Sequence, residues 1–247
     1  GLNDVENDSQ KNDKRFWAYI KSLRSEGAGV SPLKHQGKLV SDSKGKADVL
    51  NEQFRSVFTA EDGSPLRDLG PSPHPTMDEI IISVHGVHKL LSKLKPHKAP
   101  GPDNINGTIL KELKDPLAPI LTIIFQKSLD TGCIPHDWKT ANVAAVFKKG
   151  EQYLASNYRP ISLTAICCKI MEHIMASQLT SHFERHNILY YLQHGVRSQR
   201  SYETQLISLV HDLAKLQNSG VQSDFLIMDF AKAFDKVSHS RLLHKLE

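Results

Sequence analysis

The chain has 247 residues, of which 39% are hydrophobic and 23% are charged, and its formal net charge is +4. A chain of this size can bury a hydrophobic core as one large domain or as two small ones. The positive charge suits a polyanionic partner, although charge alone supports only non-specific attraction. No apolar run approaches the roughly 20 residues that span a bilayer, and the polar N-terminus has no signal-peptide core. A membrane protein or a secreted protein is therefore not expected.

The cysteine and histidine pattern indicates neither a metal centre nor disulfides. Cys133 stands alone, and the adjacent residues Cys167 and Cys168 suit neither zinc binding nor a mutual disulfide. The 13 histidines are scattered along the chain. We expect reduced thiols in a nuclear or cytoplasmic setting.

Residues 1–75 are predicted to form a peripheral segment of helices and loops. Apolar residues recur at helical spacing in residues 14–24 and again in residues 46–59. The second of these helices has four predicted inward positions, Ala47, Leu50, Phe54 and Phe58. Residues 62–75 are rich in proline and glycine, which predicts a linker.

A compact second part is predicted from Thr76, a candidate N-cap, to the end of the chain. Helices are predicted over residues 87–94, 107–131, 162–186 and 203–217, and strands over residues 142–147 and 224–228. The 107–131 helix is expected to be interrupted near Pro116 and Pro119. Helices mixed with a few, widely separated strands favour the α+β class over a doubly wound α/β fold.

The apolar run 225–228 ends in the carboxylate Asp229. A carboxylate at the end of a buried strand is held stiffly, and Mg²⁺ prefers oxygen ligands of this kind. Phosphoryl-transfer sites with two metal ions about 3.5–4 Å apart share at least two carboxylates, so Asp229 alone is half of such a site. Taken alone, Asp229 is more simply explained as the cap of a following helix.

Two basic segments precede this aspartate. Arg159 suits bidentate contact with phosphate, and Lys148 or Lys149 suits a point-charge contact. Solvated surface charges are the ordinary alternative for such residues. Residues 193–201 combine a glycine, two arginines and hydroxyl groups, a composition that suits the phosphates of a nucleic acid. An exposed polar loop explains that composition equally well.

Five segments in this order resemble the reverse transcriptase of non-LTR (LINE-type) retrotransposons: residues 98–103, 138–150, 157–163, 193–197 and 229–235. Residues 16–59 also resemble the linker between the endonuclease and the polymerase of those elements. The resemblance implies a right-hand polymerase fold, with residues 1–75 as the linker and residues 76–247 as the fingers and the first palm strand. It implies an RNA-directed DNA polymerase that performs magnesium-dependent nucleotidyl transfer on an RNA template, a DNA primer and dNTP.

The same resemblance implies roles for residues around the aspartate. Asp229 is expected to be the first metal-binding and catalytic aspartate, with the Phe230 carbonyl as a further oxygen ligand of Mg²⁺. The backbone N–H groups around Lys232, Ala233 and Phe234 are expected to meet the incoming triphosphate. Phe234 is also expected to exclude a ribose 2′-OH by its size.

The resemblance also implies roles for residues of the two basic segments. Lys148 and Arg159 are expected to hold the β- and γ-phosphates of the nucleotide, with Lys149 as the alternative to Lys148. The template-binding residues implied by the resemblance are Gln193, Gly195 and Arg197. Val196 stands where the family is expected to have an aromatic residue.

The family's second motif, an aromatic-x-Asp-Asp hairpin, supplies the other metal carboxylates. No Asp-Asp pair occurs in the 247 residues. The chain is therefore expected to be truncated before this motif and before the thumb, and to be inactive as a polymerase on its own, which leaves its standing as an enzyme open. The alternatives are a non-catalytic nucleic-acid-binding fragment and a relic without function.

Overall fold

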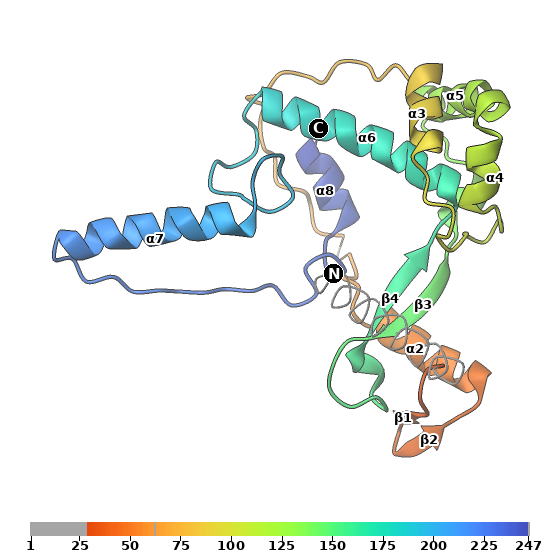
Figure 1. Ribbon diagram of the computed structural model, residues 1–247. Coiled ribbons are helices and arrows are strands. Elements are labelled where there is room, and N and C mark those ends of the chain that lie inside the picture. The colour runs from red at the N-terminus through yellow and green to blue at the C-terminus, as the bar shows by residue number, and fades with distance from the viewer. Residues whose placement is uncertain (1–28, 62, 247) are drawn as a thin grey trace, which may run out of the picture. The chain divides into compact units, whose positions relative to one another are not determined.

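The computed structural model describes residues 29–61 and 63–246, so the helix predicted over residues 14–24 lies outside the described residues. The chain divides into two compact units (Figure 1). Among the described residues, the first unit comprises residues 29–58 and 143–162, and the second comprises residues 59–61, 63–142 and 163–246. The predicted functional division at residue 75 stays a prediction.

The described residues of the first unit form an α-helix, a short 3-10 helix and two small sheets. Its elements are β1 (Leu33–His35), β2 (Lys38–Val40), α2 (Ser43–Arg55), β3 (Asn142–Phe147), the short helix η2 (Ala155–Asn157) and β4 (Tyr158–Leu163). The strand β1 pairs with β2, and β3 pairs with β4. Leu33, Leu50 and Tyr158 are buried together, so one face of the β3–β4 hairpin packs on α2 and β1.

The helix predicted over residues 46–59 is confirmed as α2, with an earlier start and end. Asp42 caps it by accepting a hydrogen bond from the Gly45 N–H at 2.7 Å. Because α2 ends at Arg55, Phe58 lies beyond the helix and is 59% exposed. The predicted inward position of Phe58 is therefore wrong, and so is that of Ala47, because Val49 is buried in its place.

The second unit is helical. Its elements are α3 (Val84–Ser92), α4 (Gly107–Glu112), α5 (Lys114–Thr131), the short helix η1 (His136–Lys139), α6 (Ile166–Arg185), α7 (Tyr202–Asn218) and α8 (His239–Leu246). Apolar residues of α3, α5 and α6 form one core, with Leu91, Phe125 and Ile170 among its buried members. The predictions of helices over residues 87–94, 162–186 and 203–217 and of the strand over residues 142–147 are confirmed, with small shifts of the helix ends.

Two details of the second unit differ from the sequence-based expectations. Ser83 caps α3 by accepting from the Gly86 N–H at 3.1 Å, so Thr76 is not the N-cap of a helix. The 107–131 helix breaks at Leu113, before either proline. Pro116 lies in the first turn of α5, where a missing N–H removes no helical hydrogen bond, and Pro119 is accommodated inside that helix.

The strand predicted over residues 224–228 is wrong. Residues 221–230 have no regular secondary structure, and residues 231–236 form a turn. Leu226, Ile227 and Met228 are each more than 80% exposed. A strand persists only through hydrogen bonds to a neighbouring strand and through cover on its apolar faces. In the described part of the chain, no strand pairs with this segment.

Helices combined with two small sheets confirm the mixed helical and β character expected from the sequence. The right-hand arrangement of fingers and palm stays a prediction. Across residues 29–61 and 63–246, no helix is long and apolar enough to cross a membrane.

Candidate functional site

The strands β3 and β4 form a hairpin whose register follows from two contacts near its turn. The Lys148 N–H donates to the Asn157 carbonyl at 2.8 Å, and the ring centroids of Phe147 and Tyr158 lie 5.7 Å apart. The connection over residues 148–157 is shorter than the crossover that parallel strands require, so the pair is antiparallel. Residue 148 therefore lies opposite residue 157, and residue 147 lies opposite residue 158.

This register brings Lys148 and Arg159 to the same face of the hairpin. Side chains alternate between the faces of a strand, and the buried Tyr158 marks the inner face. Lys148 and Arg159 are then diagonal neighbours on the outer face, a relation that places residues about 7–8 Å apart. Both are exposed, and none of the described carboxylates forms an ion pair with either one. Two cations so placed suit adjacent phosphate groups.

Lys149 lies in the turn between the two strands and is not one of the paired residues that define this register. The turn itself depends on Gly150, whose φ of 88° lies in the left-handed region. A Cβ atom at Gly150 would lie 2.7 Å from Nδ2 of Asn157, which donates to the Glu151 carbonyl at 3.0 Å. Asn157 therefore fixes the turn that presents Lys148. This role of Asn157 was not predicted from the sequence.

Asp229 is exposed near the end of the non-regular segment over residues 221–230, and the turn over residues 231–236 follows it. Lys232 has a φ of 56°, and its carbonyl accepts from the Lys236 N–H at 3.1 Å. Phe234 is 92% exposed. Among the described residues, no backbone hydrogen bond engages the N–H groups of Lys232, Ala233 or Phe234. The contact of these groups with an incoming triphosphate stays a prediction.

The donor set around Asp229 does not fit a two-metal magnesium site. Such a site needs at least two carboxylates, and Asp229 supplies one, to which the Phe230 carbonyl adds a single neutral oxygen. No group of three or more histidine, cysteine, aspartate or glutamate side chains lies close enough to hold a metal ion in the part of the chain that the structure describes. Residues outside this set are needed to complete a magnesium site.

Arg197, expected to touch the template, is engaged inside the protein. Its Nε donates to Oε1 of Glu184 at 2.9 Å, its Nη2 lies 2.5 Å from Oε2, and its Nη1 donates to the Tyr190 carbonyl at 3.1 Å. The side chain of Arg197 is 7% exposed. The hydrogen bond from Arg197 lowers the pKa of Glu184 and raises that of Arg197. These contacts hold the loop against α6, and the expected template contact of Arg197 stays a prediction.

The rest of this loop is anchored but leaves its tip exposed. Nδ1 of His194 lies 2.7 Å from the Thr204 hydroxyl at the start of α7. Gln193 is exposed, and Gly195 has no neighbour within 4 Å of a Cβ position. Val196 is 97% exposed with a φ of 59°, a strained conformation for a β-branched residue. Template contacts through Gln193 and Gly195 stay a prediction.

Lys148 and Arg159 belong to the first unit, whereas Asp229 and the loop over residues 193–201 belong to the second. All of them fall in one matched range. Residues 146–247 match the family described as "Reverse transcriptase (RNA-dependent DNA polymerase)". The chain is also 26% identical, over 93% of its length, to the RNA-directed DNA polymerase from mobile element jockey of Drosophila melanogaster.

The chain is related to the reverse transcriptases of non-LTR retrotransposons. The resemblance drawn from the sequence is thus confirmed. The probable RNA-directed DNA polymerase from transposon BS of Drosophila melanogaster is 28% identical over 94% of the chain. An uncharacterized 149 kDa protein of transposon TX1 from Xenopus laevis is 27% identical over 97% of it. The chain spans about a quarter of the length of the two fly reverse transcriptases, 26% and 27% respectively.

Proposed function

We propose that this chain forms the nucleotide-binding and template-binding part of an RNA-directed DNA polymerase, with the fingers and the start of the palm in residues 76–247. The observation that carries the proposal is the pair Lys148 and Arg159. These cations share one face of a hairpin, lack a described carboxylate partner, and lie in the range that matches reverse transcriptases. Their charges hold and offset the β- and γ-phosphates of an incoming dNTP.

The segment after the predicted metal ligand completes the nucleotide contacts. The N–H groups of Lys232, Ala233 and Phe234 donate to the triphosphate, and the exposed Phe234 ring stands under the sugar. Asp229 and the Phe230 carbonyl contribute oxygen ligands to a magnesium site that other carboxylates complete. Gln193 and Gly195 contact the RNA template of a template–primer duplex.

The cellular setting follows from the thiols. Cys133, Cys167 and Cys168 are free, and burial raises the pKa of the Cys167 thiol to about 11. Free thiols, of which Cys167 and Cys168 are buried, agree with a nuclear or cytoplasmic setting.

Calorimetric titration of the 247-residue chain with dTTP, and separately with inorganic triphosphate, tests the proposal. The double variant Lys148→Ala/Arg159→Ala should lose about tenfold in affinity for both ligands, because charge-assisted hydrogen bonds to phosphate disappear. The matched control is Lys38→Ala/Arg55→Ala, which removes one lysine and one arginine from exposed positions of the same unit.

Retained affinity in the control and loss in the test variant would support the assignment. Equal losses in the two variants would overturn it, since they would show that only total charge matters. Unchanged affinity in the test variant would also overturn it.

A further inference from the structure

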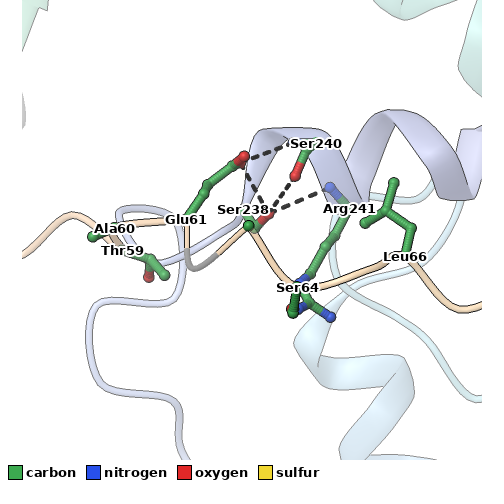
Figure 2. A pocket seen from close by; sticks show the side chains of 9 residues that line it. Thr59, Ala60, Glu61, Ser64, Leu66, Ser238, Ser240 and Arg241 are labelled. Carbon is green, nitrogen blue, oxygen red and sulfur yellow. Dashed lines mark hydrogen bonds between the residues drawn. The ribbon is translucent and has the colours of Figure 1, made fainter.

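Residues 59–61 and 63–67 lie along the segment that follows the Asp229 turn, although 177 positions separate the contacting residues in the sequence. The Thr59 hydroxyl donates to the Lys236 carbonyl at 2.9 Å. Oε1 of Glu61 accepts from the Ser238 hydroxyl at 3.0 Å and from the Ser240 N–H at 3.1 Å (Figure 2). The two stretches enclose a cavity of about 100 Å³.

Two further contacts join the same segment to α8. Nη2 of Arg241 donates to the Ser64 hydroxyl at 2.7 Å, and Nε2 of His244 lies 2.8 Å from the Arg67 carbonyl. Residues 59–61 and 63–67 thus contact the turn before α8, its first turn and its last turn. A chance contact of two exposed loops would not follow a helix over its length.

Glu61 supplies a helix cap from a distant part of the sequence. The first N–H groups of a helix have no partner within it, and a negative charge there is favourable. In α8 the Ser238 hydroxyl accepts from the Arg241 N–H at 3.3 Å, while Glu61 accepts from the Ser240 N–H. The capping side chains of α2, α3, α4 and α7 come instead from residues that directly precede those helices.

We propose that residues 59–61 and 63–67 form a clasp that positions the Asp229 turn through α8, with Glu61 as the main positioning residue. The role given to Asp229 rests on the proposed function, whereas the clasp rests on the contacts above. Among the described residues, no strand pairs with residues 224–230 on the N-terminal side of the turn. The turn is therefore held in place from its C-terminal end. Thr59 holds that end directly, at the carbonyl of Lys236.

Acidification is expected to weaken the clasp, because Glu61 loses its charge. The backbone hydrogen bond from Ser240 lowers the pKa of Glu61, the Ser240 and Ser238 side chains lower it further, and His239 adds a smaller coulombic effect. A carboxylate whose pKa is lowered by folding stabilises the fold at pH values above its unfolded pKa. That contribution is lost as the pH falls through the folded pKa. Arg241 is the other charged group on the facing turn of α8.

Amide NMR spectroscopy of the full 247-residue chain tests the clasp without any need for polymerase activity. The Ser240 amide should shift as Glu61 titrates, because this N–H donates to the carboxylate. Glu61→Ala should speed hydrogen exchange of the Ser240, Lys236 and Val237 amides by roughly fivefold at neutral pH, as expected for a lost cap. Glu61→Gln should retain part of the protection and abolish the acid titration.

The matched control is Glu79→Gln, an exposed glutamate of the same unit with no recorded contact to α8. It should leave both readouts unchanged. A Ser240 amide that titrates equally in Glu61→Gln would overturn the clasp. Faster exchange at Ser240 with unchanged Lys236 and Val237 would overturn the positioning role, because α8 alone would then be affected. None of these outcomes depends on nucleotide binding.

Discussion

Arg159 and Arg197 carry the same guanidinium group in different surroundings. Arg159 is exposed and unpaired among the described residues, whereas Arg197 binds both oxygens of Glu184. Both arginines lie in segments that resemble reverse transcriptases, so similar phosphate-binding roles were predicted for them. Only the fold distinguishes them, because the carboxylate partner lies 13 positions away, on another element.

Replacing Glu184 by Gln should release the loop around Arg197. One charge-assisted contact is lost and a nearly buried guanidinium is left without its anion, which is costly in the folded state. Limited proteolysis should then cut the loop over residues 188–201 several times faster than in the parent chain. Arg185→Ala is the control, because its contact to Asp78 is long, at 3.9 Å, and exposed. Equal cleavage of the parent and Glu184→Gln would contradict the structural role of Arg197.

The same pair predicts an acid-sensitive loop. Folding lowers the pKa of Glu184, so the stabilisation is present above its unfolded pKa and is lost as the pH falls through the folded pKa. Proteolysis by an acid-active protease should therefore accelerate on acidification in the parent chain. The Glu184→Gln variant should show a smaller dependence on pH.

At the scale of elements, helices could be predicted from the sequence, whereas the strand predicted over residues 224–228 is absent from the structure. Apolar spacing located α2, α3 and α6, since each of these helices buries its own apolar face. The spacing also located α7, although none of its residues is buried. The run over residues 225–228 has the composition of a buried strand, but its state depends on neighbours that the local sequence does not encode. Its exposure is the observation that supports the relic alternative, because exposed apolar runs promote aggregation.

The loop over residues 98–103, one of the segments that resemble reverse transcriptases, has room only for a glycine at position 101. A Cβ atom on Gly101 would lie 2.4 Å from the Ala165 nitrogen and 2.6 Å from the Thr164 carbonyl carbon. Backbone atoms at the start of α6 cannot move aside as a flexible side chain can. The surface that this loop packs against could not be predicted from the sequence, because the contacting backbone of Thr164 and Ala165 lies far along the chain.

Gly101→Ala should therefore lower the free energy of unfolding by about 1–3 kcal/mol, the usual range for overpacking. Gly195→Ala is the control, because nothing lies near its Cβ position, and it should change stability by less than about 0.5 kcal/mol. Urea unfolding followed by circular dichroism measures both. A neutral Gly101→Ala variant would contradict the close contact with α6.

At the scale of the whole molecule, similarity covers nearly all of the chain but about a quarter of its fly relatives. Catalysis by the 247 residues alone is not expected, because the two-metal reaction needs further carboxylates beside Asp229 and no such group is found among the described residues. Primer extension on poly(rA)/oligo(dT) with magnesium should give no product from the purified chain. Clear incorporation of dTTP would show that this account of the metal site is wrong.

The central claim, that this chain binds template–primer duplex and nucleotide as part of a reverse transcriptase, is tested most directly by hybrid binding across a salt series. Fluorescence anisotropy with labelled poly(rA)/oligo(dT) should show affinity that falls steeply between about 50 and 200 mM salt, as phosphate contacts release counterions. Excess dTTP should not displace the hybrid, because the nucleotide has its own contacts at Lys148 and Arg159. An absence of binding, or an affinity that stays flat as salt rises, would contradict the account.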